Sequence, residues 1–284
     1  MERSKRMWKF LFLLPSAAIV WLIYEWFEHN AIQYNTTSIT FDKLKEKPMI
    51  KLCLITDLHN NKKNCVKIRK KIQEFSPELI LLAGDMVDKH KTENPYAKQL
   101  IVELAKIAPV YYSVGNHEEQ LMKQHKKEWE NYLYQLKENI YFLNNKGNYA
   151  LKEQNIFVSG LSLPKEFYKK GSLYKKTDQL PKFFIPKNCF HIMLAHNPEY
   201  ANLYKNYKAD LIVSGHLHGG LMRLPLIGGL ISPRLRFSGC DAGLVSLGKD
   251  NKLFISRGLG SHTIPLRFFN RVEINFLVLS GTKL

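Results

Sequence analysis

The sequence has little cysteine and few acidic residues. Its four cysteines are widely spread and form no CxxC pair, so neither a zinc ribbon nor a dithiol redox motif is supported; they are Cys53, Cys65, Cys189 and Cys240. Cys53 lies in an apolar run and is predicted to be a small buried hydrophobe, while the disulfide state of the four stays open. Aspartate and glutamate number 25 against 42 lysines and arginines, a net charge of +17. Such a field attracts polyanions: nucleic acid, anionic lipid or a phosphate-bearing substrate.

The sequence also lacks internal repeats and low-complexity tracts. Hydrophobic residues make up 45% of its 284 residues, so the chain can bury a sizeable core and disorder is disfavoured. Its length favours one large α/β domain over two small ones.

The N-terminus combines a basic flank with an apolar run. Arg3, Lys5, Arg6 and Lys9 precede the run Phe10–Tyr24, and aromatic residues surround it. No small-residue cleavage site follows, so we predict an uncleaved single-pass membrane anchor over residues 1–30, with the following domain outside the cytoplasm. The run is short against the ~20 residues of a spanning helix. A helix lying in the membrane interface is therefore the alternative.

Short apolar runs alternate with helical patterns in the rest of the chain. The predicted strands are Ile50–Thr56, Leu79–Ala83, Val110–Val114, Ile156–Ser159, Phe190–Ala195, Leu211–Ser214, Leu244–Leu247 and Leu253–Ser256. Helical stripes fall at 65–75, 97–105 and near 118–136. The alternation predicts an α/β fold, with sheets covered by helices. The polar segment Ala31–Lys47 suits a tether or a first edge strand.

Metal-seeking side chains follow five of these runs. They are Asp57-Leu58-His59, Gly84-Asp85, Gly115-Asn116-His117, His196 and Gly215-His216-Leu217-His218. Each motif alone has an ordinary structural explanation. Together, in order and at strand ends where α/β sheets bind ligands, they predict a site for two divalent cations.

This pattern resembles the calcineurin-like metallophosphoesterase superfamily, whose signature is D-x-H, G-D, G-N-H, a later His and G-H-x-H. The stretches at 219–220, 224–229, 256–260 and 265–271 are similar to its membrane-anchored bacterial phosphodiesterase branch. The resemblance implies a two-sheet αββα sandwich. The predicted parts are an anchor at 1–30, a tether at 31–48 and a metallophosphoesterase domain at 49–284.

The resemblance also implies a role for each motif residue. One metal would be held by Asp57, His59, Asp85 and His218, and the other by Asp85, Asn116, His196 and His216. Mixed nitrogen and oxygen ligands fit Mn²⁺, Fe or Zn²⁺ better than Ca²⁺, and the family favours Mn²⁺. A hydroxide bridging the metals would attack phosphorus, and His117 would stabilise the transition state or protonate the leaving oxygen.

Two further polar residues are candidates for substrate binding. Asn60 is placed to reach the substrate phosphate or, equally, to cap a turn. Arg257, at the exit of a predicted strand, is a candidate phosphate clamp.

The sequence indicates the substrate class less directly than it indicates the metal site. The basic and aromatic segment Lys165–Lys187 suits contact with an anionic lipid surface or with single-stranded nucleic acid. The alternative is a solvated basic insertion that binds neither. With the anchor, lipid is favoured and nucleic acid disfavoured, and the apolar stretch Leu221–Leu230 would accept an acyl or prenyl chain. We expect a phosphodiesterase acting on a lipid-linked or envelope phosphoester. The alternatives are a sugar-nucleotide-lipid pyrophosphatase and a catalytically weak metal-binding scaffold for partner proteins. The oligomeric state stays open.

Overall fold

The computed structural model describes residues 2–136, 139–169, 180–182, 184–220, 222–224, 228–231, 241–248, 250–260 and 267–281. The segments Lys165–Lys187 and Leu221–Leu230, which bear on the predicted lipid contacts, lie partly outside these ranges, as does Cys240. The other three cysteines carry free thiols, and Cys53 is fully buried as predicted.

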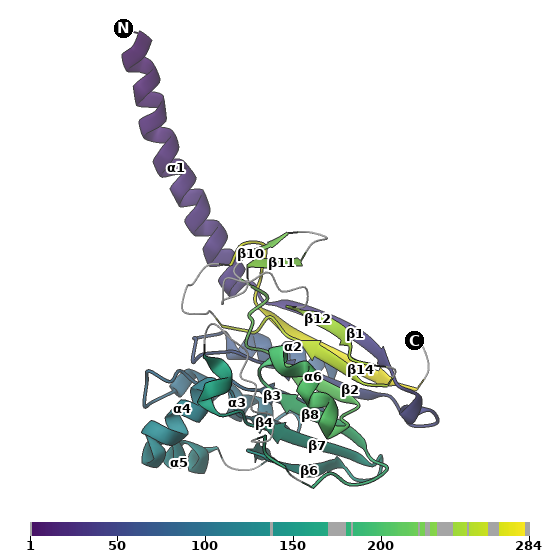
Figure 1. The fold of residues 1–284 in the computed structure, drawn as a ribbon. Coiled ribbons are helices and arrows are strands. Elements are labelled where there is room, and N and C mark those ends of the chain that lie inside the picture. The colour runs from purple at the N-terminus through teal and green to yellow at the C-terminus, as the bar shows by residue number, and fades with distance from the viewer. Residues whose placement is uncertain are drawn as a thin grey trace.

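Two six-stranded sheets form the body of the protein (Figure 1). The first has the order β1 (Gln33–Thr40), β14 (Glu273–Ser280), β2 (Ile50–Ile55), β3 (Leu79–Ala83), β4 (Val110–Ser113) and β5 (Ile140–Leu143). The second has the order β12 (Gly243–Ser246), β13 (Lys252–Ile255), β9 (Leu211–Ser214), β8 (Phe190–Ala195), β7 (Ile156–Leu161) and β6 (Lys146–Leu151). A two-stranded ribbon joins β10 (Met222–Leu224) to β11 (Gly228–Ile231). All eight predicted strands are present within two residues at each end.

Helices connect the strands. They are α1 (Glu2–Asn30), α2 (Cys65–Phe75), α3 (Pro95–Ala105), α4 (Asn116–Gln124), α5 (Lys126–Gln135) and α6 (Ala201–Tyr204), with short 3₁₀ turns at Asp42–Leu44, Lys165–Tyr168, Pro198–Tyr200 and Lys205–Tyr207. The predicted helix near 118–136 is two helices. The break falls at His125, whose φ of −134° and ψ of 53° lie outside the helical region.

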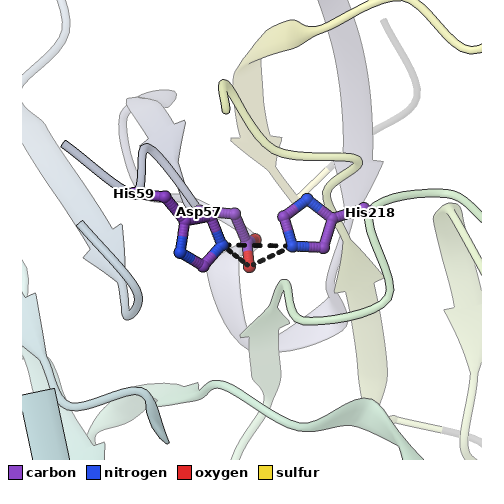
Figure 2. A group of neighbouring side chains, drawn as sticks. All are labelled: Asp57, His59 and His218. Atoms are coloured by element: carbon purple, nitrogen blue, oxygen red, sulfur yellow. Dashed lines mark hydrogen bonds and ion pairs between the residues drawn. The ribbon is translucent and has the colours of Figure 1, made fainter. Parts of the chain in front are cut away.

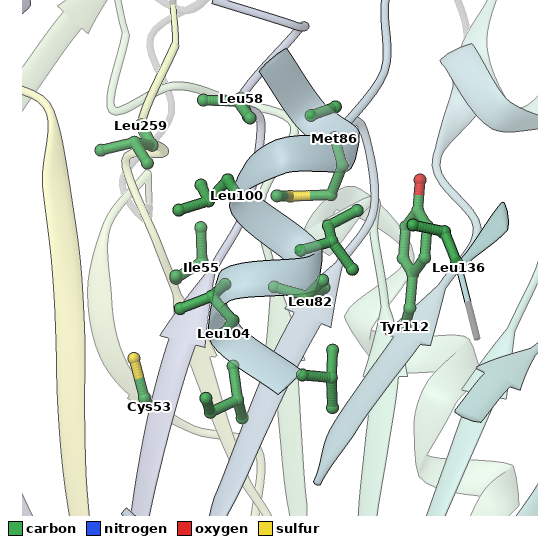
Figure 3. Close-up of a cluster of buried hydrophobic side chains, with 14 of the residues drawn as sticks. Cys53, Ile55, Leu58, Leu82, Met86, Leu100, Leu104, Tyr112, Leu136 and Leu259 are labelled. Atoms are coloured by element: carbon green, nitrogen blue, oxygen red, sulfur yellow. The ribbon is translucent and has the colours of Figure 1, made fainter. Parts of the chain in front are cut away.

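Three apolar layers hold the sheets and helices together. Alternate side chains of a strand face opposite sides of a sheet, so Leu52 and Leu54 pack between the two sheets while Cys53 and Ile55 face the helices. On the helical side, Leu100 and Leu104 of α3 lie over the strands (Figure 3). A third layer packs the outer face of the second sheet against α6 and its flanking turns. The layers confirm the predicted α/β sandwich of two sheets between helices.

The N-terminal segments differ from the expectation. Among the helices that the structure describes, none is both long enough and apolar enough to cross a membrane, so the predicted spanning anchor is not supported. The apolar run is short and charged residues bound it on both sides. Residues 33–40 form β1, which pairs in parallel with β14 along eight residues. The segment 31–48 therefore contains an edge strand of the sheet, which is the second of the two interpretations that its sequence allowed.

Strand direction decides where the motifs meet. In the first sheet β2, β3, β4 and β5 run parallel, and in the second sheet β7, β8, β9 and β13 do. Each motif follows the carboxyl end of one of these strands. The motif residues of both sheets thus lie at one edge of the sandwich.

Candidate metal centre

The turns after the strands carry the motif side chains into the protein. Asp57, Asp85 and His196 are at most 2% exposed, and His218 is 4% exposed. The turns are joined by backbone hydrogen bonds, since Asp57 N–H donates to Gly84 O over 3.0 Å and His59 N–H donates to Asp85 O over 3.0 Å. Gly215 N–H similarly donates to His196 O over 3.1 Å. These bonds continue the sheet beyond the strand ends and fix the spacing of the side chains.

Several of these turns have left-handed backbone. Positive φ angles of 49–68° occur at motif residues from three of the turns: Asp57, His59, Asn60, Asp85, His216 and His218. Asp, Asn and His tolerate this region better than most side chains, but it still costs conformational energy. Such strain gathers at functional sites, where the surrounding structure imposes it. The site's backbone is thus held in place by its surroundings.

Two motif glycines leave room for the carboxylates. A Cβ at Gly215 would lie 2.1 Å from Asp57 Oδ2, and a Cβ at Gly115 would lie 2.3 Å from Asp85 Oδ1. Both distances are far below van der Waals contact. The glycines of G-N-H and G-H-x-H are therefore required by the close approach of backbone to the acidic side chains.

A first group of donor atoms comes from Asp57, His59 and His218 (Figure 2). His59 Nε2 lies 3.2 Å from His218 Nε2 and 3.9 Å from Asp57 Oδ1, and His218 Nε2 lies 3.5 Å from the same oxygen. Two atoms bound to one cation at about 2.1 Å lie roughly 3–3.5 Å apart. The three side chains therefore fit a shared cation with little movement.

A second group comes from Asp85, His196 and His216. His196 Nδ1 donates to Ala83 O over 2.8 Å, which leaves Nε2, 3.2 Å from Asp85 Oδ2, to bind a cation in place of the proton that the carboxylates attract there. His196 Nε2 and the nearby Asn116 Oδ1 are both buried without a hydrogen-bond partner. Buried polar atoms are rarely unpaired, and a cation would satisfy both. The donor atoms of this group therefore fit a metal as well.

Opposite charges are concentrated between the two groups. Burial raises the pKa of Asp57 to about 6, although His196 opposes this shift. Burial alone would lower the pKa of His196, but Asp85 and Asp57 outweigh it and raise that pKa to about 10. Asp85 is buried too, yet the surrounding imidazoles hold its pKa well below its usual range. The buried carboxylates thus attract positive charge strongly, and a divalent cation suits this field.

His117 begins helix α4 and lines a cavity of about 300 Å³ beside both groups. Its Nε2 lies 4.0 Å from Asp85 Oδ2, and its Nδ1 accepts a hydrogen bond from Lys89 N–H over 3.1 Å. A neutral ring that accepts at Nδ1 carries its proton on Nε2. His117 can therefore donate a hydrogen bond from Nε2 at the site, which suits the predicted stabilisation of the transition state.

Two predicted substrate residues have other partners. Asn60 Oδ1 accepts from Tyr96 N–H and Ala97 N–H over 2.9 and 3.1 Å, so it caps the start of α3. Arg257 forms an ion pair with Glu273 and donates to Gln33 Oε1 over 3.0 Å. Arg257 is not among the described residues that line the cavity, and its phosphate contact stays a prediction. Asn60 caps a turn, as the alternative predicted, but it also lines the cavity, so its contact with the substrate phosphate stays a prediction too.

Glu118 has a larger role than its predicted place at a helix start. Its buried carboxylate accepts from the N–H groups of Asp85, Met86 and Gly115 over 2.8–2.9 Å, and from Tyr112 O–H over 2.7 Å. One side chain thereby ties the turns after β3 and β4 together. The Gly-x-x-Glu spacing indicates a helix start, but the bonds to residues some thirty positions away follow only from the fold.

On the other side of the site, Arg267 and Asn270 bind the backbone around His218 in a similar way. Asn270 Nδ2 donates to His218 O over 2.7 Å, and the buried guanidinium of Arg267 donates to Gly260 O over 2.7 Å. Tyr168 packs edge-on against His216, with ring centroids 5.2 Å apart. These three positions match no metal-ligand pattern, although Arg267 and Asn270 fall in the stretch similar to the bacterial phosphodiesterase branch.

Comparison with known proteins agrees with this geometry. Residues 50–220 match the family described as calcineurin-like phosphoesterase. Phosphodiesterase YaeI of Escherichia coli is 30% identical over 207 residues, which cover 72% of each chain. The metallophosphoesterase Cj0846 of Campylobacter jejuni is 26% identical and covers 93% of this chain and 68% of its own. A metallophosphoesterase of Aquifex aeolicus is 24% identical and covers 91% and 95%.

The family match spans more than half of the chain and includes all five motifs. It also includes both groups of donor atoms. The chain therefore belongs to the calcineurin-like phosphoesterase family and is a metal-dependent phosphoesterase.

Proposed function

We propose that this protein is a phosphodiesterase with two metal ions, acting at a membrane surface on a lipid-linked or envelope phosphoester. The observation that carries the proposal is the pair of donor groups on either side of one cavity. The first metal is assigned to Asp57, His59, Asp85 and His218, and the second to Asp85, Asn116, His196 and His216. Asp85 is the shared ligand, because its Oδ2 lies within 3.9 Å of both His59 Nε2 and His196 Nε2.

The donor atoms also bear on the choice of metal. All are imidazole nitrogens or side-chain oxygens and none is a thiolate, which fits Mn²⁺, Fe or Zn²⁺, with Mn²⁺ preferred. When bound, such ions activate water for attack on phosphorus and neutralise the phosphoryl oxygens. The protein's own residues then have to orient the ester and stabilise the negative charge that develops on its oxygens.

His117 is proposed to stabilise that charge. Because Nδ1 accepts from the N–H of Lys89, Nε2–H is presented next to Asp85, where the phosphoryl group would lie. An alkoxide leaves poorly, so a diester gains from a hydrogen bond to the oxygens on which charge develops. Lys89 and Lys91 line the same cavity and add positive charge for an anionic diester.

The membrane part of the proposal is supported by exposed apolar surface on α1. Seven of its large apolar side chains between positions 19 and 27 are 41–66% exposed: Ile19, Val20, Trp21, Leu22, Ile23, Trp26 and Phe27. Phe269 of the catalytic domain, 52% exposed, lies next to Tyr24 of this helix. Contiguous exposed apolar and aromatic groups of this kind suit a membrane interface. Localisation at the cell membrane, with the site on the extracytoplasmic side, is part of this proposal.

The full chain in detergent is the material for the test. It would be assayed with a chromogenic phosphodiester and the matching phosphomonoester, in Mn²⁺, Zn²⁺ or EDTA. We expect diester cleavage that requires metal and is abolished by Asp85→Asn, with bound metal measured in parallel. No turnover of any ester despite two bound metal ions would contradict the proposed activity and leave the metal-binding scaffold.

The membrane part has a separate test. Flotation of the full chain with vesicles containing anionic lipid is expected to carry the protein upward, and Trp21→Ser with Trp26→Ser is expected to weaken this. Protein that stays at the bottom of the gradient with every vesicle composition would contradict membrane attachment without affecting the assigned chemistry.

A further inference from the structure

The last two turns of α1 are packed against the catalytic domain. Figure 1 shows the helix extending away from the sheets and meeting the domain at its C-terminal end. There Glu25 and Glu28 are 8% and 3% exposed, whereas Ile23 and Trp26 of the same turns are more than 60% exposed. Charged side chains are thus buried while apolar neighbours on the helix remain exposed. Buried carboxylates are costly unless they are bound, so this face of the helix is a specific interface.

The interface is made with the segment just before β14. Arg267 N–H donates to Glu25 Oε2 over 3.1 Å, and Phe269 N–H donates to Tyr24 Oη over 2.6 Å. Val272 N–H donates to the Glu28 carbonyl over 3.2 Å. Trp21 stacks on Phe268 with ring centroids 5.7 Å apart. Helix α1 therefore holds the backbone of residues 267–272 at several points.

The same segment supports the metal ligand His218. The Arg267 guanidinium donates to Gly260 O and Arg257 O over 2.7 and 2.9 Å, and its Nη2 lies 3.5 Å from His218 Nδ1. Asn270, whose carbonyl accepts from Arg267 Nη1 over 2.9 Å, holds the His218 carbonyl. Contacts therefore run without a gap from Glu25 of α1, through Arg267, to both the ring and the backbone of His218.

We propose that Glu25 is a positioning residue for the first metal, acting on His218 through Arg267. The inference rests on the proposed two-metal site. Glu25 fixes the main chain of Arg267, and the guanidinium in turn limits how His218 can turn toward Asp57 and His59. The N-terminal helix is then part of the support of the active site as well as a candidate membrane attachment.

The test is a Mn²⁺ titration of the full chain in detergent, followed by calorimetry. Glu25→Ala removes the acceptor, while Glu25→Gln keeps an oxygen for Arg267 N–H. Glu28→Ala is the matched control, because Glu28 lies in the same interface but pairs with Arg271 at 3.5 Å. His218→Ala and His196→Ala identify which binding step belongs to which metal. The melting temperature of each variant in EDTA reports its stability without metal.

We expect Glu25→Ala to weaken the step that His218→Ala abolishes by about 5-fold, less than the ~10- to 100-fold effect of losing a direct partner of a ligand, because Glu25 acts through Arg267. The other step and both steps of Glu25→Gln and Glu28→Ala should match the wild type. Equal weakening of both steps together with a lower melting temperature would show a merely structural role and overturn the inference. So would unchanged binding by Glu25→Ala, or an equal effect of Glu28→Ala. A wild type that binds fewer than two Mn²⁺ ions would instead contradict the proposed two-metal site, and the inference with it.

Discussion

The candidate metal centre has two halves: the motif turns that follow strands of the first sheet, and the motif turns that follow strands of the second. Buried groups of opposite charge support these two halves. On the side of the first sheet, the Glu118 carboxylate gathers backbone N–H groups around Asp85. On the side of the second sheet, the Arg267 guanidinium gathers backbone carbonyls around His218. Each ion is buried and is bound to main-chain groups, which is how a buried charge becomes tolerable.

The two supports differ in how far they reach along the chain. Glu118 is next to His117 and ties turns at most 33 positions away. Arg267 depends on a helix 242 positions away. The first half therefore needs only segments that lie close in sequence, whereas the second half is complete only when α1 has met the segment before β14. We expect the first support to matter most for folding and the second for metal binding.

The largest effect is expected from Glu118→Ala. The variant leaves buried donors of Asp85, Met86, Gly115 and Tyr112 without their acceptor, and each costs about 1–3 kcal/mol. We expect a loss of more than ~4 kcal/mol in the free energy of unfolding, measured by guanidinium denaturation. Glu119→Ala is the control, because its recorded partner is the exposed Lys123 and its loss should cost about 1 kcal/mol or less. Similar losses in the two variants would remove the special role of Glu118.

Low pH is expected to destabilise the protein through His191, a buried histidine of the second sheet. His191 of β8 is 1% exposed, and its Nε2 pairs with Ser159 Oγ at 2.7 Å. Burial, aided by the charge of Lys43, lowers the pKa of this imidazole to about 4. Between pH 6.5 and 4 the unfolded chain therefore binds a proton that the folded protein does not. Stability falls as the pH falls through this window, by up to about 3 kcal/mol from this residue.

His191→Gln tests that assignment. The difference in unfolding free energy between wild type and variant, both in EDTA, should shrink by up to about 3 kcal/mol as the pH is lowered from 7 to 4. His90→Gln, at an exposed histidine, is the control and should show a constant difference. A pH-independent difference for His191→Gln would mean that the buried imidazole is not held neutral.

Arg267→Lys should have a smaller effect on stability and a selective one on metal. Lysine keeps the positive charge but cannot reach three carbonyls and His218 in one plane. We expect the affinity for the first metal to fall about 10-fold, with the second metal unaffected, in the same Mn²⁺ titration. The control Arg257→Lys changes a residue that pairs with Glu273 and should leave both steps unchanged. Loss of both metals in Arg267→Lys would erase the distinction between the two supports.

The difference in reach also explains what the sequence could predict. Apolar runs that end in polar residues predicted the central strands and the candidate metal ligands, because the end of a buried strand can be recognised from neighbouring residues alone. The edge strand β1 pairs with β14, 240 positions later, so its polar pattern was compatible with a tether. Glu118 was recognised as a helix start, but its bonds to Asp85 and Met86 depend on the packing of α4 beside β3.

The partner of Arg257 could not be predicted for the same reason. Its place after a strand suggested a phosphate contact, but Glu273, which neutralises it, lies on β14. Arg267 sits ten residues further on and is the arginine that approaches the site. The local sequence does not show which of the two arginines approaches the site, because the partners of each lie on a different element of the fold.

The smallest effect on stability and metal binding is expected at Tyr168. Its substitution tests how His216 is supported on the side of the second sheet. Its ring packs edge-on against His216, while its hydroxyl is buried without a recorded hydrogen-bond partner. If the ring supports His216, Tyr168→Phe removes only an unpaired polar group and should leave metal affinity unchanged and stability equal or about 1 kcal/mol higher. Tyr168→Ala removes the ring and should weaken the second metal. A fall in kcat/KM for Tyr168→Phe with unchanged metal binding would mean that the hydroxyl contributes to catalysis, because phenylalanine keeps the ring that packs against His216.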